Sequence, residues 1–262
     1  MTDEILLEKR DGVATITINR PTQRNAINYP GWLELHRIAV DLEHDPDTKV
    51  VVLTGAGDAA FSSGADIKDF ELYRNSAAKA KMYAAAFEGA MDAVEALSKP
   101  TICLIKGFCV GGGCELTLAA DIRIAADNSK FGIPVAKLGI LVGYSEMRRL
   151  VNLVGPGNAS YILLTGRMWD TAEALRVGLV SLVVPLAQAH DFTYGLANEM
   201  TKLAPLSQGR HKRIMRTVLS NPSLEGLTPE EKALPLTNFD SEDFHEGRRA
   251  FVERRPPQFK GR

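Results

Sequence analysis

Apolar runs that suit buried strands alternate with helical stretches along this chain. This alternation restricts the possible folds of the chain more strongly than any other pattern in it. Residues 50–53 are a continuous apolar run, residues 101–105 suit another buried strand, and residues 121–126 have the pattern of a further strand. The stretch 29–42 before these segments and the stretch 77–97 between the first two carry apolar residues at helical spacing. Strands and helices that alternate in this way indicate an α/β core.

The two ends of the chain differ from the alternating middle. Residues 5–8 and 13–18 are typical of two strands, and Asp11-Gly12 between them is a pair that favours a hairpin turn. The last quarter of the chain favours only helices. We therefore expect a core domain over residues 1–195 and a helical region over residues 196–262.

Shorter elements are expected in the middle of the chain. Residues 112–119 and 172–178 favour short helices, and residues 179–184 favour a strand that ends at Pro185. Each of these elements continues the order of strand, turn and helix.

Composition narrows the class of protein. The 31 Lys and Arg residues balance 32 Asp and Glu residues, so no overall basic field favours nucleic acid. Cys103, Cys109 and Cys114 lack C-x-x-C spacing, which argues against a disulfide framework or a zinc site. No apolar run approaches the roughly 18 residues of a membrane span, and the acidic N-terminus does not resemble a targeting peptide. We expect a cytoplasmic protein without a nucleic-acid, membrane or metal partner.

Two glycine-rich segments could suggest nucleotide binding, but neither has the right context. Residues 55–60 fit G-x-G-x-x-A, yet residues 61–66 are expected to continue as a loop where a dinucleotide-binding fold needs a helix. Residues 107–113 lack the Gly-Lys-Ser/Thr ending of a phosphate-binding loop. What remains is a pair of loops that each leave a strand and whose small residues let a ligand reach the backbone.

The glycine triplet at residues 111–113 falls at the expected start of a helix. Unpaired N–H groups and the helix dipole favour a developing negative charge there, although close helix packing is an alternative role. Glu115 lies one helical turn beyond Gly112, so its carboxylate can reach the same place. A solvated charge is the usual fate of a glutamate, but the apolar neighbours Cys114 and Leu116 favour a buried one.

Together these segments closely resemble the enoyl-CoA hydratase/isomerase (crotonase) family. The resemblance is carried by residues 60–68, 106–116, 120–125 and 131–134. Shorter matches follow in the order of the family over nearly the whole chain, at residues 19–21, 25–27, 164–166, 172–174, 178–180 and 251–256. The resemblance implies a crotonase-like spiral of repeated β-β-α units with a helical C-terminal extension that assembles a homotrimer, or a dimer of trimers as a homohexamer.

The same resemblance implies an enzyme that acts on acyl-CoA. The N–H groups of Ala65 and Gly112 would form an oxyanion hole for the thioester oxygen, and Glu115 would act as the acid/base. Polarising the thioester acidifies the α-carbon, and one well-placed donor supplies on the order of 3–4 kcal/mol to the resulting enolate. We expect lyase or isomerase chemistry on an enoyl- or 3-hydroxyacyl-CoA, with coenzyme A as part of the substrate and no separate cofactor.

The chain departs from the family at Val135. Family hydratases carry a second Glu directly after the Pro of Phe-Gly-x-Pro, and a valine cannot transfer a proton, so ordinary hydration is in doubt. Tyr144 and Glu146 lie where the family more often has small residues and could replace the lost group. For Glu146, a salt bridge with Arg148 or Arg149 is an equal alternative. Decarboxylation of a malonyl-type acyl-CoA and non-catalytic acyl-CoA binding also stay open.

For the coenzyme A part of the substrate, the resemblance points to five residues, namely Arg24, Ala65, Lys68, Phe251 and Arg254. Lys68 and Arg24 match positions near the nucleotide and its phosphates. Phe251 and Arg254 match C-terminal residues that reach the site, often from a neighbouring subunit. Cationic and aromatic groups suit a polyanionic nucleotide, although each residue could also be a solvated charge or a packed ring.

Overall fold

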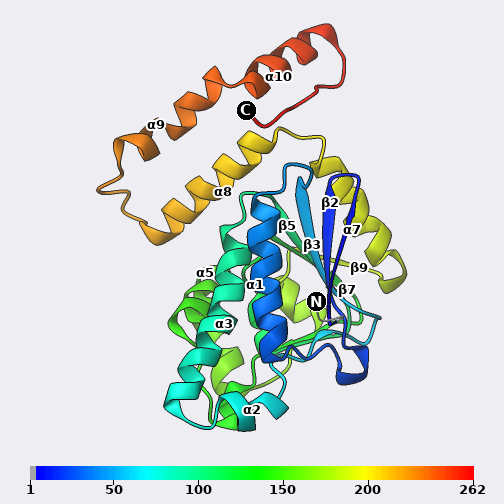
Figure 1. The fold of residues 1–262 in the computed structure, drawn as a ribbon, viewed down its shortest axis with the longest axis vertical. Coiled ribbons are helices and arrows are strands. Elements are labelled where there is room, and N and C mark those ends of the chain that lie inside the picture. Colours follow the sequence, from blue (N-terminus) through cyan, green and yellow to red (C-terminus); the bar gives the residue numbers. More distant parts are fainter. Residues whose placement is uncertain (1–3) are drawn as a thin grey trace.

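A six-stranded sheet forms the centre of the computed structural model, which describes residues 4–262 (Figure 1). Its first two strands form the expected antiparallel hairpin, and Asp11 and Gly12 at the turn both have positive φ, 52° and 82°. The other strands run parallel, in the order β1-β2-β3-β5-β7-β9. The strands are β1 (Ile5–Arg10), β2 (Val13–Ile18), β3 (Val50–Gly55), β5 (Thr101–Ile105), β7 (Ile122–Ala126) and β9 (Leu182–Val184). The strand expected over residues 179–184 is therefore shorter than its sequence pattern.

A second, parallel sheet has three strands in the order β4-β6-β8. The strands are β4 (Ala60–Ser62), β6 (Phe108–Val110) and β8 (Lys130–Gly132). Each follows a strand of the main sheet along the chain, which gives the repeated β-β-α unit. The expectation that residues 61–66 form only loop was wrong at β4, because a strand of three residues is too short to show a periodicity.

Helices cover both faces of the main sheet. α1 (Tyr29–Glu43) and α3 (Ala77–Ala96) pack against each other over one face, where Val51 and Leu53 of β3 are buried (Figure 1). α7 (Leu186–Met200) packs over the other face, which holds Val50 and Val52. Successive strand residues point to opposite faces, so the continuous apolar run at β3 serves both layers.

The remaining helices of the core differ in how well the sequence predicts them. The long α5 (Tyr144–Thr165) was not expected, because Gly155 and Pro156 interrupt its pattern, and the helix is kinked at Gly155 (φ 75°, ψ 162°). The short helices expected over residues 112–119 and 172–178 are present with slightly different ends. These helices are α2 (Lys68–Tyr73), α4 (Gly112–Thr117), α5 (Tyr144–Thr165) and α6 (Thr171–Arg176), with 3-10 turns η1 (Pro21–Gln23) and η2 (Val135–Leu138).

Three helices after α7 form an extension that projects from the core (Figure 1). They are α8 (Pro205–Ser220), α9 (Pro229–Thr237) and α10 (Glu242–Glu253), with the 3-10 turn η3 (Asn238–Asp240) between the last two. The division at residue 195 stays a prediction, and α7, which packs on the sheet through Ala189 and Ala197, crosses it. Within residues 4–262, no helix combines the length and apolar character needed to cross a membrane.

Candidate active site

A cavity of about 560 Å³ lies where the loops after β4 and β6 meet the helices α2 to α5. Five of the residues singled out from the sequence line it, namely Ala65, Lys68, Gly112, Glu115 and Glu146, and Val135 lines it too. A larger hollow of about 1110 Å³ lies against the C-terminal extension, but its lining includes none of those residues. The chemistry of the lining, rather than its volume, therefore marks the smaller cavity as the candidate site.

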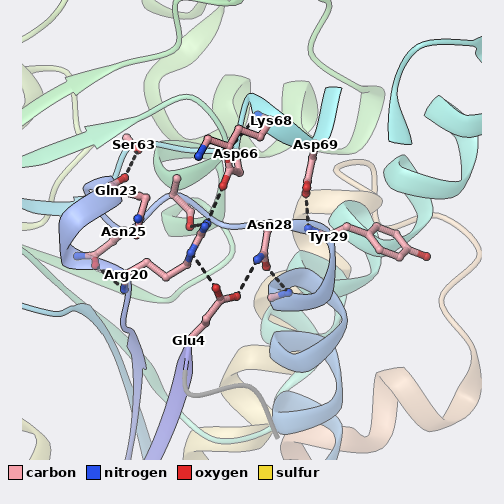
Figure 2. Close-up of polar contacts among 12 residues, drawn as sticks. Glu4, Arg20, Gln23, Asn25, Asn28, Tyr29, Ser63, Asp66, Lys68 and Asp69 are labelled. Carbon is pink, nitrogen blue, oxygen red and sulfur yellow. Dashed lines mark hydrogen bonds and ion pairs between the residues drawn. The ribbon is translucent and has the colours of Figure 1, made fainter. Parts of the chain in front are cut away.

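The loop that carries Ala65 is fixed to the segment before α1. Ile27 N–H donates to the carbonyl of Gly64 (2.8 Å), and Asp66 N–H donates to the carbonyl of Ile27 (2.9 Å). The Asp66 side chain pairs with the guanidinium of Arg20 at 2.9 Å (Figure 2). These bonds occupy the backbone on both sides of Ala65, whose own N–H has no acceptor among residues 4–262.

A polar network extends this anchor to the start of α1 (Figure 2). Arg20 also contacts Glu4 at 3.1 Å, and Glu4 accepts a hydrogen bond from the side chain of Asn28 at 2.7 Å. Asn28 caps α1, and the Asp69 carboxylate of α2 accepts from Tyr29 N–H at 2.5 Å. The network therefore joins the loop to residue 4 just before β1, to the N-cap of α1 and to α2. The short motif at residues 19–21 supplies the central cation.

The glycine triplet brings the second loop against the first. Gly64 has φ +99°, and a Cβ there would lie 2.8 Å from the Val110 carbonyl and 3.0 Å from Gly112 N. A Cβ on Gly113 would lie 2.6 Å from the Cβ of Ser62 in β4. The triplet thus serves close packing, the alternative role considered from the sequence, and the same packing brings the backbones of the two loops together.

Two backbone N–H groups are therefore neighbours at the cavity wall. Gly112 is the first residue of α4, so its N–H has no partner within the helix. A Cβ built on Gly112 would lie 3.5 Å from the nitrogen of Ala65. In the described part of the chain neither N–H donates a hydrogen bond. Such a pair of donors can stabilise an oxyanion.

Glu115 is buried beside this pair, with 5% of its surface exposed. The expectation of a buried rather than a solvated charge is confirmed, and the neighbouring Cys114 and Leu116 are fully buried. Burial, and then the negative charge of Glu146, raises the pKa of Glu115 to about 8, against the opposing field of Arg74. A carboxyl group with this pKa can both give and take a proton near neutral pH.

Glu146 supplies a second buried carboxyl group from the first turn of α5. Burial raises its pKa, and the charge of Glu88 adds to the effect, while Arg149 opposes it. Nη1 of Arg149 lies 3.7 Å from Oε1 of Glu146, and neither atom has a hydrogen-bond partner within residues 4–262. The two interpretations of Glu146 are therefore compatible, because it lines the cavity and also faces a cation.

Arg149, rather than Arg148, is the cation that faces Glu146. The other end of its guanidinium binds Asp92 at 2.5 Å and Glu95 at 2.6 Å on α3. Arg148 lies 3.6 Å from Glu95 and is half exposed. A buried arginine thus ties α5 to α3 and leaves one nitrogen beside the cavity carboxylate.

The other sequence candidates lie outside the cavity lining. Tyr144 is 98% exposed at the start of α5. Arg24 stacks on the ring of Phe108, with Cζ 5.2 Å from its centre. Phe251 is 85% exposed, and it and Arg254 belong to α10 and its cap, at the opposite end of the molecule from α2 (Figure 1). One chain therefore brings only Lys68 and Ala65 of the expected coenzyme A contacts to the cavity.

Two charged residues of the cavity wall were not found from the sequence. Arg74 ends α2 and Glu88 lies on α3, and both line the cavity. The spacing of Phe70 and Arg74, four residues apart, was a usable signal, because such residues meet on one helix face. No spacing in the sequence pointed to Glu88, because the residues that face it come from another helix, α5.

Known proteins resemble the chain over nearly its full length. The model of a family described as enoyl-CoA hydratase/isomerase matches residues 8–262. A crotonyl-CoA hydratase of Syntrophomonas wolfei is 36% identical over 264 residues, 98% of each chain, and a carnitinyl-CoA dehydratase of Citrobacter koseri is 35% identical over the full length of both. The crystal structure of an enoyl-CoA hydratase/carnithine racemase from Magnetospirillum magneticum superposes with a TM-score of 0.96 at 35% identity, covering 100% of this chain and 97% of that one. The crotonase-like fold expected from the sequence is thereby confirmed.

Proposed function

Because the chain belongs to the enoyl-CoA hydratase/isomerase family and is an acyl-CoA-processing enzyme of that type, we propose that it adds water reversibly across the α,β double bond of an enoyl-CoA. The observation that carries the proposal is the pair of buried carboxyl groups, Glu115 and Glu146, in the cavity that also holds two unpaired N–H groups. The relative named crotonyl-CoA hydratase supports a short enoyl chain as the first substrate to test.

The unpaired N–H groups would bind the thioester oxygen. Addition of hydroxide to the β-carbon places a negative charge on that oxygen, and the N–H groups of Ala65 and Gly112 would donate to it. Each donor would supply on the order of 3–4 kcal/mol, because the loops hold it in place before the reaction. Lys68, at the same wall, would lie towards the coenzyme A part of the substrate.

The carboxyl pair would supply the two proton transfers. Water addition needs one group that takes a proton from water and one that gives a proton to the α-carbon. Because Glu115 and Glu146 repel each other when both are charged, the pair tends to hold one proton near neutral pH. Glu146 would therefore replace the carboxylate that is missing at Val135. The reverse reaction uses the same pair with the roles exchanged.

Turnover of a panel of thioesters tests this function. Purified enzyme is given crotonyl-CoA, 3-hydroxybutyryl-CoA and a malonyl-type CoA, and products are identified by mass. We expect the enzyme to interconvert crotonyl-CoA and 3-hydroxybutyryl-CoA. We also expect Glu115→Gln to lower turnover by about 10²-fold or more while the thioester still binds. Release of CO₂ from the malonyl-type ester without hydration, or full turnover by Glu115→Gln, would overturn the proposal.

The C-terminal extension would assemble the active oligomer, as a homotrimer or a dimer of trimers. It exposes several large apolar side chains, namely Met215, Val218, Leu219, Leu236, Phe239, Phe251 and Val252. Clustered exposed apolar groups are typical of protein contacts. In the assembly, Phe251 and Arg254 would reach the coenzyme A site of a neighbouring subunit. Light scattering at micromolar concentration tests this, and a monomer would contradict it.

A further inference from the structure

We propose that the cavity accepts enoyl-CoA thioesters whose acyl chain ends in a carboxylate, and that Arg74 binds this carboxylate. The inference rests on the proposed function, since it specifies the acyl group for the same site. It depends on the position of Arg74, on its lack of a counter-ion and on the acidic residues that line the same cavity.

Arg74 is held in place against two aromatic rings of the cavity wall. Its N–H donates to the carbonyl of Phe70 (3.1 Å) at the end of α2. Its Cζ lies 4.6 Å from the ring centre of Phe70 and 4.9 Å from that of Tyr83. All three residues line the cavity. A guanidinium stacked in this way is already ordered, so little conformational freedom is lost when it binds a ligand.

The guanidinium of Arg74 has no counter-ion among residues 4–262. Other arginines beside the cavity are paired, Arg20 with Asp66 and Arg149 with Asp92. No ion pair or side-chain hydrogen bond is formed by Arg74 in the described structure. A planar guanidinium next to apolar rings pairs favourably with a carboxylate, which can accept two parallel hydrogen bonds.

The acidic residues of the cavity leave this cation free. Glu146 faces Arg149, Asp66 is paired with Arg20, and Glu115 holds its proton at neutral pH. Glu88 is unpaired, but it acts on Glu146. On α3 its backbone lies five residues, about 7.5 Å along the helix axis, from that of Tyr83, whose ring Arg74 covers. The end of the cavity at Arg74 therefore presents a positive charge.

Arg74 also lines the same cavity as Glu115 and the two unpaired N–H groups. Its charge acts on Glu115, the residue placed beside the thioester. The coenzyme A contacts implied by the family resemblance, Arg24 and Lys68, instead belong to the loops around η1 and the start of α2. A carboxylate on the acyl chain thus fits this cation better than a phosphate of coenzyme A does.

Matched substrates test the proposal. Glutaconyl-CoA carries a terminal carboxylate, and 5-methylhex-2-enoyl-CoA replaces its two oxygens with methyl groups of similar size. We expect kcat/KM of the wild type to favour glutaconyl-CoA by at least about 10-fold, and Arg74→Met to bring the ratio to one or below. An effect of Arg74 on Glu115 changes kcat/KM for both substrates alike, so it cancels in the ratio of the two values. Arg74→Lys should keep part of the preference, because it keeps charge but loses the bidentate geometry.

A control variant and a binding assay separate the possible outcomes. Lys81→Met removes an exposed cation of α3 that does not line the cavity, and it should leave the ratio as in the wild type. Calorimetry with the unreactive pair glutaryl-CoA and 5-methylhexanoyl-CoA should show the same dependence on Arg74. If no enoyl-CoA is turned over and glutaryl-CoA still binds in a way that depends on Arg74, the proposed function is wrong and the role of Arg74 is not.

Three results would overturn the role of Arg74. The first is hydration of crotonyl-CoA without any preference for the carboxylate in turnover or binding. The second is a preference that survives in Arg74→Met. The third is a preference for 4-(trimethylammonio)but-2-enoyl-CoA over both matched substrates, which would mean that Glu88 and Glu146 set the charge of the cavity.

Discussion

Glu115 of α4 and Glu146 of α5 line the same cavity, and the charge of Glu146 contributes to the raised pKa of Glu115, about 8. The two residues are 31 positions apart in the sequence and come from different helices. Each one's protonation therefore depends on the other, as in other carboxyl pairs that share a site. Rate and stability should both report this coupling.

The pH dependence of hydration should be bell-shaped. Glu146, with its pKa raised above 4.5, must be ionised to accept a proton, so kcat/KM falls as pH decreases. Glu115 must be protonated to donate, so kcat/KM falls as pH rises through about 8. Glu146→Gln should lower the rate by about 10²-fold and, since it removes a like charge, move the alkaline limb to lower pH. Stopped-flow or steady-state assays over pH 5 to 10 measure both effects.

The exposed Glu225→Gln serves as the control for this profile, because Glu225 lies outside the cavity. Its profile should match the wild type. An alkaline limb that stays in place in Glu146→Gln would show that the two carboxyl groups do not interact.

The main sheet could be predicted from the sequence because its signals are local. The Asp11-Gly12 turn and the apolar runs at β3 and β5 depend on neighbouring residues. The three-residue strand β4 and the kinked α5 could not be predicted, since β4 is shorter than any period and Gly155-Pro156 breaks the pattern of α5. Tertiary contacts decide both.

The candidate site divides in the same way. Ala65, Gly112 and Glu115 lie within contiguous motifs, so their proximity could be anticipated from the family resemblance. Arg74 and Glu88 reach the cavity only because α2, α3 and α5 pack around it, and no sequence spacing connects these helices. The fate of Glu146 was open for the same reason, since its cavity position and its partner Arg149 both depend on packing.

Glu115→Gln should stabilise the protein at alkaline pH. The pKa of this group is raised in the folded protein, so stability is fully present below the unfolded value of about 4.5 and is lost as pH rises towards about 8. The loss amounts to about 1.4 kcal/mol per pH unit within that window. A neutral amide does not ionise, so the variant should gain on the wild type between pH 5 and 8. Urea unfolding at several pH values measures the difference, and parallel curves for the two proteins would contradict the raised pKa.

The oxyanion hole can be tested by removing one N–H group. Gly112 is the first residue of α4, a position that tolerates proline, and Gly112→Pro removes the N–H. We expect turnover about 10² to 10³-fold below that of Gly112→Ala. The alanine variant is the matched control, because in both variants a Cβ would lie 2.8 Å from Cε2 of Phe87. Equal turnover of the two folded variants would show that this N–H does not bind the thioester oxygen.

Val135 is the position where the chain departs from the family, and moving the carboxylate there tests whether Glu146 has replaced it. Val135 lines the cavity in the turn η2, on the same wall as the start of α5. In the Glu146→Gln background, Val135→Glu should raise crotonyl-CoA hydration by at least about 10-fold, because a second proton-transfer group returns. Val135→Gln in the same background is the control for size and polarity.

In the wild-type background the same substitution should help little, because it adds a third carboxylate beside Glu115 and Glu146. Partial burial and like charges would raise its pKa and lower the free energy of unfolding by about 1–3 kcal/mol. If Glu146 is not a replacement, the wild type should instead hydrate crotonyl-CoA poorly, and Val135→Glu alone should increase the rate. The comparison of the two backgrounds decides between these outcomes. If Val135→Glu raises the hydration rate only in the Glu146→Gln background, a carboxylate at position 135 can replace the one at position 146.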